Sequence, residues 1–69
     1  MPPASDVAEL SSVRAQLEEL TVRVVSVCDH YRDSEDSAVT GELDQAERAL
    51  VGAARALDHA IVRLSGRGR

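Results

Sequence analysis

The sequence predicts an all-α protein, a two-helix antiparallel hairpin with Leu/Ala heptad seams, dimerising into a four-helix bundle. Apolar residues recur at alternating spacings of three and four in both halves of the chain, as in helices that pack along a seam. A polar segment rich in turn-forming residues separates the two halves. The chain has 69 residues and one Cys, so its core is small and no internal disulfide can form. A partner subunit is therefore the expected source of the missing stability.

The first helix is expected over about residues 6–33, after a disordered N-terminal segment at 1–5. The two prolines near the start are expected to keep the first residues out of the helix, and Ser5 or Asp6 can cap it. Its seam is made of three heptads of a and d positions. These seam residues are Leu10, Val13, Leu17, Leu20, Val24, Val27 and Tyr31.

The second helix is expected over about residues 38–65, with the turn at about 34–39 and a flexible Arg/Gly tail at 66–69. Ser37 and Thr40 can each begin this helix, because either hydroxyl can accept a hydrogen bond from the first free amides. The sequence leaves that choice open. The seam of the second helix has the same spacing as the first and consists of Leu43, Ala46, Leu50, Ala53, Leu57, Ala60 and Leu64.

The apolar faces of both helices are wider than one partner helix can cover. On the second helix, Ala46, Ala49, Ala53, Ala56 and Ala60 form a stripe of small residues. A homodimer, as an antiparallel four-helix bundle, or a higher helical oligomer would cover these faces, and a heterologous helical protein could do so as well. The expected oligomer interface is Leu10, Val13, Leu17, Leu20, Val24, Val27, Leu43, Ala46, Leu50, Ala53, Leu57, Ala60 and Leu64.

The charge pattern predicts how two copies are oriented. Residues 22–52 carry seven acidic and three basic side chains, a net charge of −4, whereas the remaining residues balance. We expect the two turns to lie at opposite ends of the dimer, because each acidic turn then lies near the basic end of the partner's second helix.

Basic side chains recur every four residues near the end of the second helix, at Arg55, His59, Arg63 and Arg67, with Arg14 at about the same level on the first helix. Such a patch could bind a phosphate, a nucleic-acid backbone or an acidic partner. The same side chains would also suit a solvated face at the negative end of the helix dipole. The net charge of −4 makes nucleic acid the less favoured partner.

Reactive side chains gather at Cys28 and His30, which point about 200° apart on a helix of ~3.6 residues per turn. They could share a metal only across a subunit interface, and otherwise Cys28 packs as a small apolar group. The ligand spacing of a metal site is missing, so no metal and no cofactor are expected. The predicted seams are apolar and a Gly-rich phosphate loop is missing, so the chain is not expected to be an enzyme.

The hairpin of alternating Leu and Ala resembles the small hairpin RNA-binding regulators of plasmid copy number. Those proteins read RNA with a basic, aromatic-containing face of their first helix. Here the first helix offers Arg14, Arg23 and Arg32 among acidic residues. The resemblance is therefore one of architecture, and no functional residue is transferred from it.

These observations favour a non-catalytic, self-associating interaction protein that acts as an adaptor, a small regulator or an assembly subunit. The alternative is a regulator that binds nucleic acid or a phosphate ligand through the Arg-rich ridge. A metal-binding bundle with inter-subunit ligands is the third possibility. The longest apolar run has three residues and the start does not read as a signal peptide, so a cytoplasmic protein is expected. The use of Arg without Lys is typical of a GC-rich bacterial genome.

Overall fold

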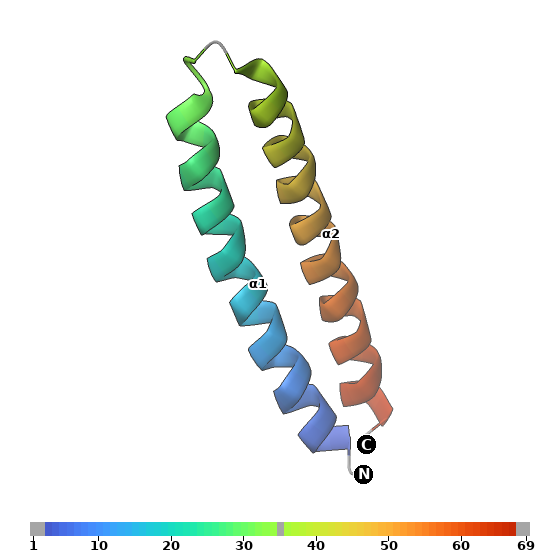
Figure 1. Cartoon of the computed structure of the whole chain (residues 1–69). Coiled ribbons are helices and arrows are strands. Elements are labelled where there is room, and N and C mark those ends of the chain that lie inside the picture. The colour runs from blue at the N-terminus through green and yellow to red at the C-terminus, as the bar shows by residue number, and fades with distance from the viewer. Residues whose placement is uncertain (1–2, 35, 68–69) are drawn as a thin grey trace.

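The chain folds as two long antiparallel helices joined by a short turn (Figure 1). The structure is a computed structural model that describes residues 3–34 and 36–67. Helix α1 spans Pro3–Tyr31 and helix α2 spans Ser37–Arg67. The Cα atoms extend over 54 × 14 × 13 Å, and the described residues contain no strand. The prediction of an all-α chain with two helices packed against each other is confirmed.

The helices are longer at the chain ends than the sequence pattern indicates. Helix α1 begins at Pro3, because proline suits the first turn of a helix, where its missing N–H would have no partner. Three residues of the expected disordered segment 1–5 are thus helical, and residues 1–2 lie outside the described residues. Helix α2 continues past Gly66 to Arg67, and the rest of the expected tail, residues 68–69, also lies outside them.

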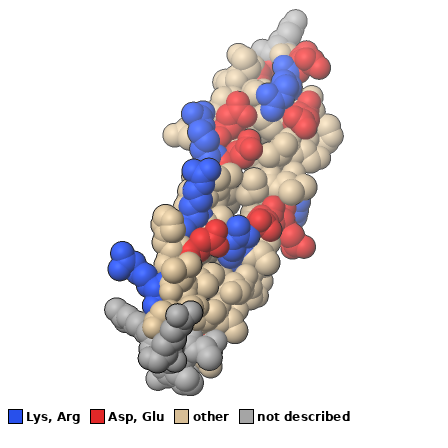
Figure 2. Space-filling view, turned by 180° about the vertical axis from the view of Figure 1, so that it is seen from behind, with Lys and Arg blue, Asp and Glu red and all other residues tan. Residues whose placement is uncertain are grey.

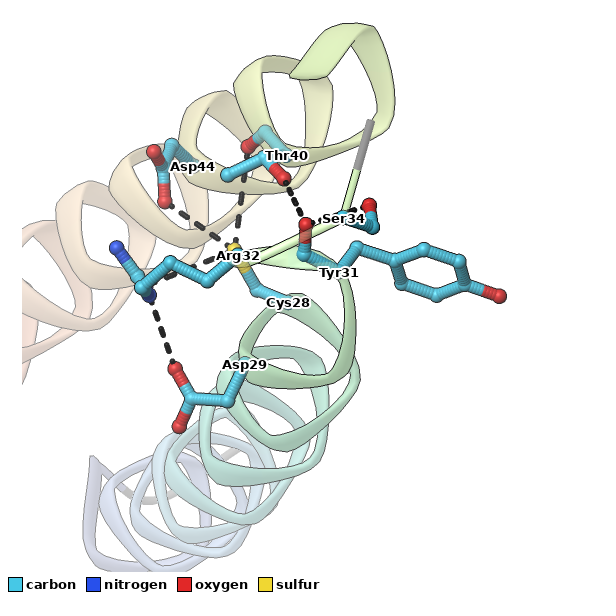
Figure 3. Close-up of polar contacts among 7 residues, drawn as sticks. All are labelled: Cys28, Asp29, Tyr31, Arg32, Ser34, Thr40 and Asp44. Atoms are coloured by element: carbon cyan, nitrogen blue, oxygen red, sulfur yellow. Dashed lines mark hydrogen bonds and ion pairs between the residues drawn. The ribbon is translucent and has the colours of Figure 1, made fainter. Parts of the chain in front are cut away.

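The turn is closed by hydrogen bonds to the main-chain carbonyl of Tyr31, the last residue of α1 (Figure 3). Ser34 donates to this oxygen from its hydroxyl at 2.7 Å and from its amide at 3.0 Å. Thr40 donates to the same oxygen at 3.3 Å from the first turns of α2. Because α2 begins at Ser37, Thr40 lies inside the helix. Its hydroxyl joins the two helices and completes a carbonyl that the end of a helix leaves unpaired.

The two helices meet along a seam that is shifted from the predicted one at alternate positions, although Val13, Ala46 and Ala60 of the predicted seam are also partly covered. The seam residues are spaced alternately three and four positions apart and are at least partly covered. They are Val7, Leu10, Arg14, Leu17, Thr21, Val24 and Cys28 of α1 and Thr40, Leu43, Glu47, Leu50, Ala54, Leu57, Ile61 and Leu64 of α2. The leucines of α2 are thus in the seam as predicted. Leu20 and Val27, in contrast, are 42% and 45% exposed, and Tyr31 is 41% exposed.

The hairpin buries very little of its own surface. Among the described residues, only Cys28 is buried, at 1% exposure, whereas the seam leucines are half-buried. A pair of helices can cover each other along a single line of side chains only, because each helix is a cylinder. The seam therefore holds the hairpin together without enclosing a core.

Candidate interaction surfaces

The seam divides the hairpin surface into two long sides. At ~3.6 residues per turn, the residue three positions after a seam residue lies about 60° to one side of it around the helix axis. The residue four positions after it lies about 40° to the other side. Thr21 and Ala54 each lie four positions after a seam leucine, and they line the same groove. The residues three positions after the same leucines, Leu20 and Ala53, consequently lie on the other side of the hairpin.

One side carries ion-paired residues from both helices, and we call it the charged side. Its groove is lined by Arg14, Glu18, Thr21, Val22, Val51, Ala54, Arg55 and Asp58. Figure 2 views this side and shows Arg side chains interleaved with Asp and Glu along its length. Arg14 crosses from α1 to α2, where its Nε lies 2.5 Å from Oδ1 of Asp58, and its Nη1 lies 2.8 Å from Oε1 of Glu18. Hydrogen bonds to Asp58 and then Glu18 raise the pKa of the Arg14 guanidinium.

The predicted basic patch lies partly in the groove of the charged side. Arg14, held by two carboxylates, and the exposed Arg55 both line this groove, whereas His59 and Arg63 are exposed on α2 outside its lining. Within the described part of the chain, neither Arg55 nor Arg63 forms an ion pair. The side chain of Arg67 lies outside the described residues. Three exposed side chains are thus available to a ligand, and Arg14 is already neutralised.

The opposite side, which we call the apolar side, consists of Val13, Leu20 and Val27 of α1 with Ala46, Ala49, Ala53, Ala56 and Ala60 of α2. A groove on this side is lined by Leu20, Arg23, Val24, Val27 and Leu43. The alanines in the middle of α2 are exposed. Most of these residues belong to the predicted oligomer interface. Of the predicted interface residues on this side, Leu20, Val27 and Ala53 are exposed, whereas Val13, Ala46 and Ala60 are partly covered.

Cys28 is the centre of a polar cluster at the turn end of the seam (Figure 3). Its Sγ lies 3.4 Å from Oδ1 of Asp44 and 3.9 Å from the carbonyl oxygen of Thr40, and it accepts from Nη2 of Arg32 at 3.7 Å. Burial, and then the Asp44 carboxylate, raises the pKa of the thiol above its ordinary value of 9.0. The thiol is therefore protonated at neutral pH, and a thiolate nucleophile or metal ligand is disfavoured.

The described residues do not come together as a metal-binding site. Cys28 faces α2 from within the seam, whereas His30 is exposed on the outside of α1. No group of three or more His, Cys, Asp or Glu side chains is arranged to hold a metal ion in the ranges 3–34 and 36–67. A ligand role for Cys28 across a subunit interface would require the two helices to separate at the turn.

Sequence reasoning missed the polar residues that surround Cys28. Asp44, Thr40 and Arg32 surround Cys28, yet none of them belongs to a heptad position that the apolar spacing identifies. The available signal was weak. Asp44 lies one position after Leu43, and Arg32 lies four positions after Cys28. Many solvated charged residues have the same spacing from an apolar residue.

No described helix has a stretch that is long and apolar enough to cross a membrane. No protein-family model, curated protein or solved structure matches this chain.

Proposed function

We propose that this chain is a non-catalytic interaction protein that self-associates, with two hairpins forming a homodimeric four-helix bundle. In this role it acts as an adaptor, a small regulator or an assembly subunit. The observation that carries the proposal is the nearly complete absence of a core among the described residues, where Cys28 alone is buried.

The solvent-exposed area of the hairpin supports association with a second hairpin. The hairpin exposes 5260 Å², whereas a compact monomer of 7.4 kDa is expected to expose about 4,200 Å². The difference is about 1,000 Å², and each partner in a standard protein interface buries about 800 Å². One interface of ordinary size would therefore bring the exposed area of each chain to that of a compact protein.

The distribution of apolar residues supports the same proposal. Leu20 and Val27 are more than two fifths exposed, and they lie beside the exposed alanines of α2 on a single side. A continuous apolar surface of this kind is usual at protein–protein interfaces and rare on monomers. Its position along both helices suits a second helical hairpin laid across it.

The chemistry of the polar residues supports a non-catalytic role. The thiol of Cys28 is covered and protonated, and the charges of Arg14, Glu18 and Asp58 are engaged with one another. Among the side chains that the structure describes, the nucleic-acid or phosphate alternative depends on Arg55, His59 and Arg63, next to acidic side chains on the same helix. We therefore favour association between hairpins.

Sedimentation equilibrium of the purified chain tests this proposal. We expect a mass of two chains, a fully helical circular dichroism spectrum, and no change in sedimentation when a polynucleotide is added. A stable, fully helical monomer would contradict the proposal. A salt-sensitive complex with the polynucleotide, lost on changing Arg55 and Arg63 to Glu, would favour the alternative.

A further inference from the structure

The apolar side carries a pattern that is complementary to itself. Along α2 the alanines at 46, 49, 53, 56 and 60 are arranged almost symmetrically about Ala53, and a charged residue lies beyond each end. Glu42 precedes the alanines by four positions and Arg63 follows them by three. When a second α2 is laid antiparallel with Ala53 against Ala53, each Glu42 comes within one position of Arg63 of the other copy.

We propose that the apolar side is the dimer interface and that two copies pack with α2 antiparallel to α2, with Ala53 at the two-fold axis and Glu42 paired with Arg63 across the interface. This inference rests on the proposed self-association and specifies its geometry. The occupant of the apolar side is a second copy of this chain, whose turn lies at the opposite end.

The free charges at the ends of the alanines support this arrangement. Glu42 and Arg63 are exposed, and within the described hairpin neither forms an ion pair. On the charged side, the central Arg14 already has two carboxylate partners, and Arg55 is the one charged residue lining the described groove that forms no ion pair. The apolar side thus offers unpaired charges of opposite sign, which specify partner and orientation more than they add affinity.

The overall charge distribution favours the antiparallel orientation over one with the turns together. Residues 22–52 carry a net charge of −4, so turns at the same end would set two acidic halves side by side. The opposite orientation sets each acidic half against the half of the partner that carries no net charge. Alanine side chains also permit close approach of the two α2 helices, near the lower end of the 8–10 Å range for helix pairs.

A disulfide trap tests which side forms the interface. Ala53 is changed to Cys in a Cys28→Ala background, so that the introduced thiol is the only one, and the protein is oxidised under native conditions. We expect a disulfide-linked dimer on a non-reducing gel. The matched control is Ala15→Cys in the same background, because Ala15 is an exposed alanine on the outer surface of α1 and should give no linked dimer.

A charge exchange tests the orientation. Glu42→Arg and Arg63→Glu should each weaken dimerisation about tenfold, because each change places two like-charged pairs in one symmetric dimer. The double variant restores opposite charges across the antiparallel interface and should recover the native dissociation constant in sedimentation. With the turns together, Glu42 would face His30 and Arg63 would face Glu9, so the double variant would stay weak.

The outcomes separate this inference from the proposed function. A dimeric native chain without the Ala53 crosslink, or without rescue in the double variant, would overturn the geometry and leave self-association standing. A monomeric native chain would overturn both. If the Cys variants fail to fold, as judged by circular dichroism, the charge exchange alone decides, since exposed charged residues on α2 leave the hairpin seam unchanged.

Discussion

Cys28 shows how a single residue can depend on the association of the two helices. It is the deepest side chain described, and its thiol is surrounded by Asp44, Thr40 and Arg32. Its pKa is raised because burial disfavours the thiolate and Asp44 adds negative charge nearby. The folded chain consequently holds this proton at a pH at which the unfolded chain has released it.

This difference predicts a loss of stability at alkaline pH. Below the ordinary pKa of 9.0 the thiol is protonated in both states, and the favourable contribution of the neutral thiol is fully present. As the pH rises through 9.0 and towards the folded pKa, the unfolded chain loses its proton first, so unfolding becomes more favourable. We expect the Tm to fall between about pH 7 and about pH 10, and to fall less in a Cys28→Ala variant. Thermal melts followed by circular dichroism measure both, and equal losses in the two proteins would contradict this account.

At the scale of the helical elements, α2 contains a weak point at its centre. Gly52 lies in the middle of the helix, has no positive φ, and a Cβ added to it would meet nothing within 4 Å. Glycine in a helix interior is less favourable than alanine because its backbone loses more freedom on folding. Gly52 points away from α1, so a methyl group there does not disturb the seam.

Gly52→Ala is therefore expected to stabilise the fold by about 0.8–1 kcal/mol. Chemical denaturation followed by circular dichroism measures the change. Gly66→Ala is the matched control, because the same substitution near the end of α2 lies where the helix frays and should gain much less. No gain at position 52 would show that the glycine has a contact that the hairpin alone lacks, such as one with a partner.

For the whole molecule, stability is expected to depend on concentration. The hairpin has a seam and almost no core, and the proposed partner supplies the remaining burial. When folding and dimerisation are coupled, mass action stabilises the folded state as the protein concentration rises. A domain that folds alone has a Tm that does not change with concentration.

We expect the Tm to rise by several degrees for each tenfold increase in protein concentration, since tenfold corresponds to about 1.4 kcal/mol and about 1 kcal/mol shifts the Tm of a domain of this size by about 4–8 °C. Differential scanning calorimetry over a wide concentration range measures this. An Ala53→Arg variant should have a lower Tm with little concentration dependence, and Ala15→Arg should behave like the native chain. A constant Tm in the native chain would rule out coupled dimerisation.

The helices, their order and their antiparallel pairing follow from the sequence alone. The spacing of Leu10, Leu17 and Val24 and of the leucines in α2 requires a helical period, and polar residues after Tyr31 require a turn. These residues, one in each heptad, were thus correctly assigned to the seam. The start at Pro3 was missed, because a proline can either precede a helix or occupy its first turn.

Only the tertiary structure decided which neighbouring position completes the seam. Residues three and four after a leucine are both close to it on a helix surface, so the apolar pattern favoured Leu20 and Ala53 over Thr21 and Ala54. In the folded hairpin, the seam turns towards the second set, where Arg14 reaches Asp58 and Cys28 reaches Asp44. These contacts join residues that lie 44 and 16 positions apart, and no local spacing reports them. The sequence by itself determined two amphipathic helices; their packing decided which apolar residues join them and which remain exposed for a partner.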